Sequence, residues 1–402
     1  MKAVVRPSKA EGTIMAPPSK SMAHRYMICS ALSEGESIVN NISYSQDILA
    51  TIDCIRALGA DVTEEEERLI IRGRGLVADG ALTLGCRECG STLRFMVPLA
   101  MMRGEETLLT GSETLMTRPM SVYEDIAASQ GIEYKKDEKG ITVNGRLTPG
   151  RFEIPGNISS QFISGLMFVL PLLNEDSEIS LIPPVDSRSY IDLTIKALLK
   201  YGIEVRWKDE TTLAIKGNQA YSPCEVTIEG DYSNAAFLEV FNTLDGQVTV
   251  TGLDSDSRQG DRVYYDYFSR LMGGMSTLDI SDCPDLGPVL FVVAANHYGG
   301  VFTGTRRLAI KESDRGAVMC EELAKFGIET HFEEDCITIE GGEPVAPTEI
   351  VHGHNDHRIV MAMTTMLSIT GGTVDDALAV NKSFPDYYDR IRKIGIDVEL
   401  TE

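Results

Sequence analysis

Two patterns of apolar residues alternate along the chain. Long apolar runs with helical spacing occupy positions 93–102, 162–173, 235–244, 289–295 and 359–369. Between them lie short runs that alternate apolar and polar residues, at 68–72, 140–143, 212–216, 248–251 and 336–340. The first pattern predicts helices and the second predicts strands. We therefore expect a mixed α/β (α+β) fold.

The helical runs share a common type of start. Small or polar residues precede an apolar run at six places, beginning at positions 20, 89, 159, 231, 284 and 355. Most of these starts are spaced by roughly 70 residues, and one gap is nearer 50. A single strand–helix unit cannot bury its apolar faces alone, so the copies must pack together. Three copies per domain is the simplest grouping, with a break near residue 225. The short N-terminal strand fits either half.

Composition and charge narrow the class of protein. The chain has 402 residues, of which 43% are hydrophobic and 24% charged, and its formal net charge is −23. This charge argues against nucleic acid and anionic membranes as partners. No apolar run has transmembrane length, and the N-terminus is too short and too polar for a signal peptide. The eight scattered cysteines predict reduced thiols in a cytoplasmic protein.

Against this acidic background, the first helix start carries cations. Two prolines precede Ser19, which can cap a helix, and Lys20, Ser21 and Arg25 then fall on or near its first turn. Free backbone N–H groups at a helix start attract anions, and an ammonium, a hydroxyl and a guanidinium strengthen that attraction. The pattern suits a phosphate or carboxylate, but this stretch alone fits a solvated helix start with ordinary surface charges at least as well. The recurrence of similar starts along the chain shifts the interpretation toward an anion site.

Other starts in the first half carry similar groups. Gly90 allows close approach of a ligand to the backbone, and Ser91 or Thr92 is expected to cap the following helix. Arg118 precedes another helix and is a candidate anion contact. Hydroxyl and amide groups that suit phosphate or sugar-like oxygens stand at Ser159, Ser160, Gln161, Ser187 and Tyr190.

The second half adds candidates for proton transfer. Asp285 precedes a very apolar helix, where it is either a helix cap or a base. Lys311 and Arg315 are expected one helical turn apart with Glu312 between them, and we expect removal of Arg315 to change stability little. Further cations stand at Arg358, which opens the last apolar helix, and at Lys382 in a turn. The nearby His352 and His354 make a metal conceivable, but Arg358 would repel a cation.

Taken together, these motifs resemble the 5-enolpyruvylshikimate-3-phosphate (EPSP) synthase family of enolpyruvyl transferases. The most specific are Lys311-Glu312-Ser313-Asp314-Arg315 and Lys382-Ser383-Phe384-Pro385-Asp386-Tyr387, and the resemblance covers essentially the whole chain. It implies two domains, each of three inverted βα units with helices inside and sheets outside. The expected domains are 14–225, on the shikimate 3-phosphate side, and 226–402 with 1–13, on the phosphoenolpyruvate side, with the active site in the interdomain cleft.

The resemblance also implies an activity and its residues. The reaction transfers the carboxyvinyl group of phosphoenolpyruvate to the 5-hydroxyl of shikimate 3-phosphate and releases phosphate. Lys20 would contact both substrates, Asp285 would accept the hydroxyl proton, Lys311 would support the reacting centre, and Glu312 would exchange a proton with the phosphoenolpyruvate methylene. The residues implied for shikimate 3-phosphate are Lys20, Ser21, Arg25, Ser159, Ser160, Gln161, Ser187, Tyr190, Asp285 and Lys311. Those implied for phosphoenolpyruvate are Lys20, Gly90, Arg118, Gln161, Arg315, Arg358 and Lys382.

Neither a metal nor an organic cofactor is expected, and the resemblance suggests a monomer whose partners are its two small substrates. The chain departs from the common family pattern at Glu88, Ser91 and Phe95, which affects the expected response to the family inhibitor glyphosate. Arg307 is left out of the predicted site for the same kind of reason. Two alternatives remain: a transferase acting on UDP-N-acetylglucosamine, whose characteristic cysteine is absent from the loop at 115–117, and a catalytically silent anion-binding protein.

Overall fold

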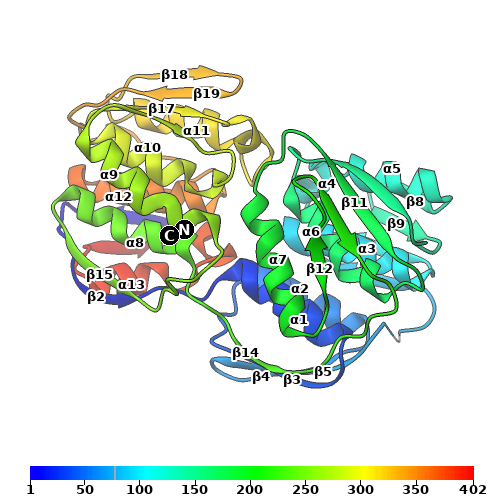
Figure 1. The fold of residues 1–402 in the computed structure, drawn as a ribbon. Helices are drawn as coiled ribbons and strands as arrows, with labels where there is room; N and C mark the ends of the chain where they lie inside the picture. Colours follow the sequence, from blue (N-terminus) through cyan, green and yellow to red (C-terminus); the bar gives the residue numbers. More distant parts are fainter. Residues whose placement is uncertain (77) are drawn as a thin grey trace. The chain divides into compact units, whose positions relative to one another are not determined.

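The computed structural model describes residues 1–76 and 78–402. It divides into two compact units, one formed by Pro18–Glu229 and the other by Met1–Pro17 with Gly230–Glu402 (Figure 1). Both boundaries lie four residues beyond the expected positions 13 and 225. Strand pairing explains the difference. Strand β2 (Glu11–Met15) pairs along its whole length with β15 (Gln247–Thr251), and β14 (Glu225–Thr227) pairs with β3 (Glu34–Asn40).

The unit 18–229 contains three four-stranded sheets with one strand order. The orders are β14-β3-β5-β4, β6-β7-β9-β8 and β10-β11-β13-β12. In each sheet the first two strands are parallel and the remaining neighbours are antiparallel. The strands not yet bounded are β4 (Asp61–Glu64), β5 (Arg68–Arg74), β6 (Leu82–Gly85), β7 (Thr107–Thr110), β8 (Glu133–Asp137), β9 (Gly140–Asn144), β10 (Arg151–Pro155), β11 (Ser177–Ile182), β12 (Val205–Trp207) and β13 (Thr212–Ile215).

Three helices of this unit are buried over most of their length. They are α1 (Lys20–Leu32), α3 (Gly90–Arg103) and α6 (Ser160–Val169). Each of these helices is buried on nearly every side, as expected for helices that pack against other elements all round. The other helices of the unit are α2 (Gln46–Ala57), α4 (Glu113–Thr117), α5 (Ser121–Gln130), the 3₁₀ turn η1 (Leu170–Leu172) and α7 (Arg188–Lys200).

The second unit repeats the same strand order in one complete sheet, β16-β17-β19-β18. A second sheet has the order β20-β1-β21, and Val351 forms a parallel bridge with Val374 of β20. The N-terminal strand β1 thus lies between β20 and β21. In the complete sheet of this unit the corresponding position is filled by β19, the last strand of its repeat in the sequence. The strands are β1 (Lys2–Val5), β16 (Ser276–Asp279), β17 (Gly300–Thr303), β18 (Thr330–Glu333), β19 (Cys336–Ile339), β20 (Gly372–Val374) and β21 (Val398–Thr401).

Buried helices again form the centre of this unit. In Figure 1, α8 (Tyr232–Glu239) and α10 (Gly287–Ala295) lie between the strands β17–β19 and the pair β2–β15. The third buried helix is α12 (His357–Thr370). The remaining helices and 3₁₀ turns are η2 (Val240–Leu244), η3 (Gly260–Val263), α9 (Tyr264–Gly273), η4 (Pro284–Leu286), η5 (Arg306–Ile310), α11 (Arg315–Ala324), η6 (Ala377–Lys382) and α13 (Tyr387–Lys393). The expected α/β fold is therefore confirmed.

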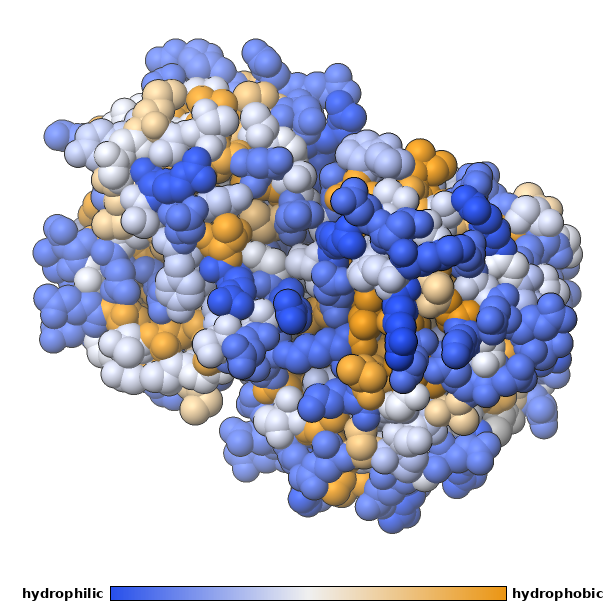
Figure 2. Space-filling view, viewed as in Figure 1, coloured by the Kyte–Doolittle hydropathy of each residue, from blue (hydrophilic) through white to orange (hydrophobic). Residues whose placement is uncertain are grey.

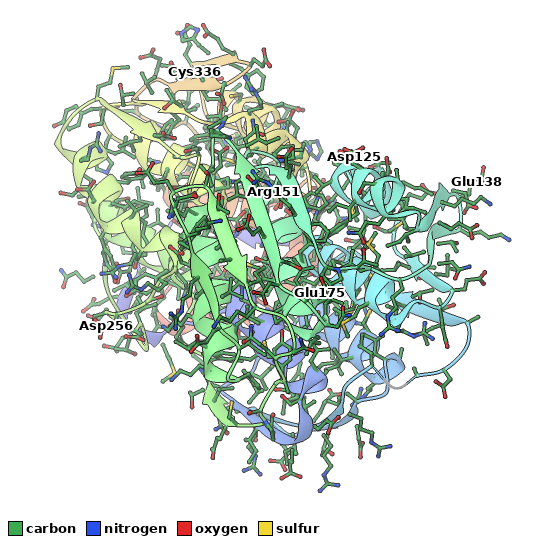
Figure 3. The ribbon with its side chains drawn as sticks, turned by 45° about the vertical axis from the view of Figure 1, so that its right-hand side comes forward. Asp125, Glu138, Arg151, Glu175, Asp256 and Cys336 are labelled. Atoms are coloured by element: carbon green, nitrogen blue, oxygen red, sulfur yellow. The ribbon has the colours of Figure 1, made fainter. Side chains whose placement is uncertain are left out.

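The surface is largely hydrophilic on the face that Figure 2 shows. Exposed acidic residues reach the periphery from both units, among them Asp125, Glu138, Glu175 and Asp256 (Figure 3). This distribution accommodates the net charge of −23 at low cost, because solvated charges repel one another weakly. Among the described residues, no helix combines the length and the apolar character needed to cross a membrane.

Candidate active site

The buried helices of the unit 18–229 begin at candidate residues and have uncharged caps. The side chains of Ser19, Cys89 and Ser159 accept backbone N–H groups at the starts of α1, α3 and α6. The capping role expected for Ser19 is confirmed. The cap expected at Ser91 or Thr92 is wrong, because α3 begins earlier and the Cys89 sulfur accepts the Thr92 amide at 3.4 Å. Neutral caps leave the positive helix ends available to an anion.

Lys20 lies in the first turn of α1 and forms an ion pair. Its Nζ is 2.7 Å from Oδ2 of Asp47, a residue of the first turn of α2. The two side chains are only 17% and 11% exposed, so the pair is stronger than one on the open surface. The ammonium is thereby held in one position at the helix start.

Arg25, which is expected to hold an anion, is buried within the unit. It is 3% exposed, and its Nε donates to the Thr194 hydroxyl at 2.8 Å. Its terminal nitrogens donate to the backbone oxygens of Ser21 and Tyr190 and to the Ser164 hydroxyl. Burial lowers the pKa of Arg25 to about 10, so the guanidinium stays charged at neutral pH. These contacts join α1 to α6 and α7.

Gln161 lies at the start of α6 and connects it to α3. Its Oε1 accepts from a terminal nitrogen of Arg94 at 2.7 Å, and its Nε2 donates to the Ser91 hydroxyl at 2.8 Å. Ser159 caps the same helix, and Ser160 is its first residue. The amide and hydroxyl groups expected to bind substrate oxygens are therefore placed beside a buried cation.

Gly90 and Arg118 are in close contact. A β-carbon added at Gly90 would lie 2.5 Å from a terminal nitrogen of Arg118, and 3.4 Å from one of Arg94. Arg118 is the C-terminal cap of α4 and, as expected, precedes the next helix, α5. The absence of a side chain at position 90 thus makes room for a guanidinium at the start of α3.

Ser187 and Tyr190 lie at the start of α7. Ser187 is 1% exposed and adopts a left-handed backbone conformation with φ 54°, which is uncommon for residues other than glycine. The Ser187 carbonyl accepts the Tyr190 amide at 3.0 Å, and the Tyr190 carbonyl accepts from Arg25. The sharp turn therefore places both candidates next to Arg25.

In the other unit, Asp285 lies between two cations. It belongs to the 3₁₀ turn η4 that leads into α10, and its Oδ1 accepts from Nζ of Lys311 at 2.9 Å and from Arg315 at 2.8 Å. Burial raises the pKa of Asp285, but Lys311, Arg315 and Arg358 outweigh it and hold that pKa well below its usual range. Asp285 is consequently ionised at neutral pH, and its side chain remains 26% exposed.

Lys311 and Arg315 do not share a helical face, contrary to expectation. Lys311 ends η5 in an extended conformation, and Arg315 is the first residue of α11, with Asp314 as its cap. The cap interrupts the helical path, so the two cations meet at Asp285 through the fold and not through helical spacing. The pKa of Lys311 is lowered by burial, an effect that the nearby Asp285 opposes.

Arg315 contacts three carboxylates and is 1% exposed. Besides Asp285, it donates to Glu312 at 2.7 Å and to both oxygens of Asp356, at 2.8 and 3.1 Å. Burial alone would lower the pKa of Arg315, but these three carboxylates raise it overall. The alternative of a salt-bridged surface helix is therefore wrong.

Arg358 and Lys382 lie on neighbouring segments. Arg358 is 4% exposed, donates to Oδ1 of Asn234 at 3.1 Å and stacks 5.2 Å from the Phe237 ring centroid. Its Nε is buried without a hydrogen-bond partner among the described residues. The Lys382 ammonium donates to the Asn355 carbonyl at 2.6 Å. The Arg358 guanidinium therefore has donor capacity left for an anion.

The two histidines weighed as metal ligands both contact carboxylates, and His354 forms with Glu321 and Glu322 a group whose possible ligand atoms lie within 4.8 Å of one another. His352 Nδ1 is 2.7 Å from Asp375, and His354 Nε2 is 2.9 Å from the fully buried Glu322. Arg307, which was left out of the predicted site, is 8% exposed and donates to the Ser281 carbonyl.

Three residues with direct contacts to the candidate site were missed or given no role in the sequence. Asp47 holds Lys20, Asp356 holds Arg315, and Asn234 holds Arg358. Asp356 is the cap of α12, whereas Asp47 and Asn234 lie in the first turns of α2 and α8. One sequence signal could have indicated these three residues. Each is an acidic or amide residue near a helix start, and other helix starts in the chain carry cations.

The two sets of residues suit chemistry on small anions. The unit 18–229 offers positive helix ends with hydroxyl, amide and guanidinium donors, and the other unit offers an ionised carboxylate beside an ammonium and two guanidinium groups. Such cations stabilise negative charge that develops in a transition state, and the carboxylate can accept a proton.

Comparison with known proteins identifies the family. The family model described as EPSP synthase (3-phosphoshikimate 1-carboxyvinyltransferase) matches residues 4–277 and 274–391. The chain is 37% identical to the 3-phosphoshikimate 1-carboxyvinyltransferase of Clostridium perfringens over 98% of both chains. It is 38% identical to the enzyme of that name from Clostridium acetobutylicum, over 98% of this chain and 97% of the other.

Solved structures support the same fold. The EPSP synthase of Acinetobacter baumannii matches all of both chains with a TM-score of 0.82 at 21% identity. The enolpyruvyl transferase NikO from Streptomyces tendae matches all of this chain and 98% of its own, with a TM-score of 0.81 at 14% identity. Because the family model and the relatives span nearly the whole sequence, this chain belongs to the EPSP synthase family.

Proposed function

We infer that this chain transfers the carboxyvinyl group of phosphoenolpyruvate to the 5-hydroxyl of shikimate 3-phosphate and releases phosphate, a step of the shikimate pathway that leads to aromatic amino acids. The observation that carries the inference is the 37% identity, over 98% of both chains, with a relative named for this activity. The ionised Asp285 between Lys311 and Arg315 supports it from the chemistry of the site.

Shikimate 3-phosphate is proposed to bind mainly to the unit 18–229. The hydroxyls of Ser21, Ser159, Ser160 and Ser187 and the amide of Gln161 suit phosphate and hydroxyl oxygens. The buried charge of Arg25 strengthens the binding of an anion, because few water molecules screen it. Tyr190 lies beside this set. Asp285 and Lys311 are proposed to contact the reacting end of the same substrate.

Phosphoenolpyruvate is proposed to bind to cations from both units. Its phosphate and carboxylate groups need several positive partners, which Lys20, Arg118, Arg315, Arg358 and Lys382 supply. Gly90 and Gln161 are proposed to border this substrate. The complete site is therefore proposed to require both units, and both substrates are proposed to contact Lys20.

The reaction is proposed to proceed by addition and elimination. In the addition, Asp285 takes the proton of the 5-hydroxyl, the oxygen bonds to the central carbon of phosphoenolpyruvate, and the methylene carbon gains a proton. In the elimination, that carbon loses a proton and the phosphate leaves. Glu312 is proposed to exchange the proton at this carbon, and Lys311 and Lys20 to stabilise the negative charge.

The proposal is tested by incubating the purified chain with both substrates and measuring phosphate. We expect phosphate release only when both substrates are present, with no requirement for an added metal ion. UDP-N-acetylglucosamine in place of shikimate 3-phosphate should give no phosphate. Release with that acceptor instead would assign the chain to the sister transferase, and no release with either would favour a silent anion-binding protein.

Compartment, assembly and inhibition follow as separate proposals. We propose a cytoplasmic location, which the eight cysteines support because all of them are free thiols. A monomeric state and binding of glyphosate in place of phosphoenolpyruvate stay predictions. Ser91, one of the residues that depart from the family pattern, contacts Gln161, so a change at this position alters the surroundings of the proposed phosphoenolpyruvate site.

A further inference from the structure

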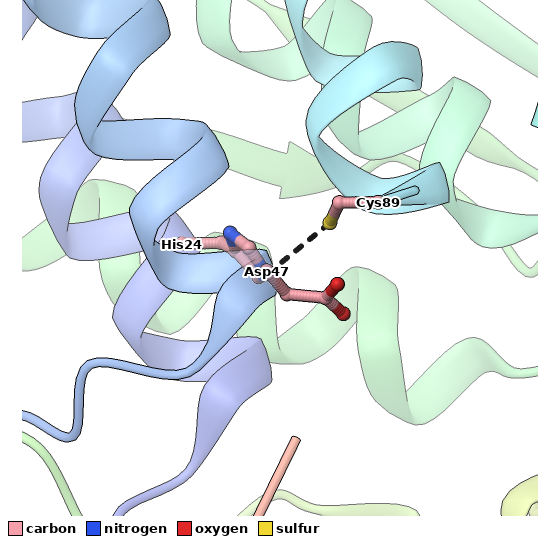
Figure 4. A group of neighbouring side chains, drawn as sticks. All are labelled: His24, Asp47 and Cys89. Carbon is pink, nitrogen blue, oxygen red and sulfur yellow. Dashed lines mark hydrogen bonds between the residues drawn. The ribbon is translucent and has the colours of Figure 1, made fainter. Parts of the chain in front are cut away.

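Three side chains with different metal-binding groups meet beside Lys20. His24 lies on α1, Asp47 in the first turn of α2, and Cys89 at the start of α3 (Figure 4). Their ligand atoms all lie within 4.8 Å of one another. The three residues are 1%, 8% and 2% exposed. We propose that His24, Asp47 and Cys89 form a binding site for a thiophilic divalent cation such as zinc.

The spacing of the donor atoms fits such an ion. Cys89 Sγ and His24 Nε2 are 3.9 Å apart. In a tetrahedral zinc site with bonds of about 2.0 Å to nitrogen and 2.3 Å to sulfur, these atoms are roughly 3.5 Å apart. The sulfur and the nitrogen therefore need to approach each other by only a few tenths of an ångström, and the Asp47 oxygen lies within 4.8 Å of both. Nitrogen, oxygen and sulfur together match the ligand set of zinc, and a water molecule or an anion completes the fourth position.

His24 is already oriented as metal-binding histidines are. Its Nδ1 lies 2.8 Å from the Thr51 hydroxyl, which in turn contacts the Thr92 hydroxyl at 2.7 Å. A hydrogen bond at one ring nitrogen fixes the ring and directs the other nitrogen to the metal. Burial, with Lys20 and Arg25 nearby, holds the pKa of His24 well below its usual range. The imidazole is therefore neutral and retains a lone pair for the ion.

The site already holds one positive charge. Asp47 binds the Lys20 ammonium at 2.7 Å, so a cation bound to Asp47 replaces one positive partner by another. Burial raises the pKa of the Cys89 thiol to about 12, so metal binding must expel its proton. The thiol becomes a metal-bound thiolate, one proton goes to solvent, and the two negative ligands balance the divalent charge.

The binding is tested with Co²⁺ and the full-length chain under reducing conditions. We expect one ion per chain and an absorption band from charge transfer between thiolate and metal. Cys89→Ser should abolish the band and His24→Asn should weaken binding more than tenfold. Cys224→Ser, which changes a thiol elsewhere in the same unit, should leave band and affinity intact.

Several results would overturn the proposal. They are the absence of saturable binding, a charge-transfer band that persists in Cys89→Ser, and a band lost in Cys224→Ser. Serine can also cap α3, so the melting temperature of Cys89→Ser should stay near that of the wild type, which separates loss of a ligand from loss of the fold.

The site also predicts an effect on catalysis. An ion that binds Asp47 displaces the Lys20 ammonium from this carboxylate, so zinc should inhibit the wild-type enzyme in a saturable manner and leave Cys89→Ser far less sensitive. Equal inhibition of both proteins would contradict this link. The inhibition experiment rests on the proposed function, whereas the cobalt spectrum is independent of it. Failure of the metal site can therefore be distinguished from failure of the proposed function.

Discussion

Arg315 and Asp285 are 30 positions apart in the chain, yet a guanidinium nitrogen of Arg315 lies 2.8 Å from Oδ1 of Asp285. The same guanidinium binds Asp356, which is fully buried. One side chain therefore fixes both the proposed proton acceptor and the start of the helix that carries Arg358. This arrangement makes Arg315 structural as well as functional.

Arg315→Met should destabilise the protein markedly, which corrects the expectation of little change. Removal of the cation leaves the fully buried carboxylate of Asp356 without this guanidinium, and breaking a buried ion pair costs about 3–5 kcal/mol. The free energy of unfolding from denaturant titration measures the loss. Arg206→Met is the control, because its ion pair with Glu204 is exposed and should contribute less than about 1 kcal/mol. Similar losses of unfolding free energy in Arg315→Met and Arg206→Met would show that burial of the Arg315 ion pairs does not matter for stability.

Folded Arg315→Met protein should also require a far higher concentration of phosphoenolpyruvate for half-maximal activity. The variant lacks one of the proposed cations for that substrate, whereas shikimate 3-phosphate is proposed to bind elsewhere. Steady-state kinetics at saturating second substrate should show a larger rise in KM for phosphoenolpyruvate than for shikimate 3-phosphate. Equal changes in both KM values would place Arg315 outside the proposed phosphoenolpyruvate site.

Asp285→Asn should slow turnover by roughly two to four orders of magnitude and leave substrate binding largely intact. The amide has nearly the same shape as the carboxylate but cannot accept the hydroxyl proton. Rapid-quench measurement of kcat, with binding of shikimate 3-phosphate measured by calorimetry, separates the two effects. Near-normal turnover in a folded variant would remove Asp285 from the role of base.

The charge of Asp285 should also make stability depend on pH. Its pKa is lowered in the folded state, so its ionised form stabilises the protein above the unfolded pKa of about 3.9, and this contribution disappears as the pH falls through the folded value. The difference in unfolding free energy between wild type and Asp285→Asn should therefore be largest near neutral pH and shrink below about pH 4. A difference independent of pH would contradict the lowered pKa.

Gly90→Ala should raise KM for phosphoenolpyruvate several-fold, with a smaller effect on shikimate 3-phosphate. The added methyl group would lie 2.5 Å from a nitrogen of Arg118, so that guanidinium must move. Gly85→Ala is a matched control in the same unit, because a β-carbon there meets nothing within 4 Å. Unchanged kinetics in Gly90→Ala would show that the position of Arg118 does not matter for this substrate.

The hydrophobic pattern predicted the buried helices well, because helices that are apolar on nearly every side leave a long continuous signal. The apolar run at 289–295, for example, corresponds to α10 (Gly287–Ala295). The domain boundaries were less accurate, since β2 and β14 pair with strands that lie more than 180 residues away in the chain. No local pattern reports pairing at that separation.

The candidate residues were visible as polar groups at helix starts, but their partners were not. The sequence placed Lys311 and Arg315 on one helix, whereas Asp314 caps α11 between them. The contact of Lys20 with Asp47 joins two helices, and that of Arg315 with Asp356 joins residues 41 positions apart. Such contacts depend on how helices pack, which residue types and spacing do not specify.

The central claim is group transfer, and it is tested most directly by following the fate of both halves of phosphoenolpyruvate. The enzyme is incubated with equimolar phosphoenolpyruvate and shikimate 3-phosphate, and the mixture is followed by phosphorus and carbon magnetic resonance. The account predicts that inorganic phosphate forms in step with an enol ether on the 5-oxygen of shikimate 3-phosphate, and that Asp285→Asn slows both signals together. Phosphate that forms together with free pyruvate, or without shikimate 3-phosphate, would show hydrolysis instead of transfer and would contradict the account.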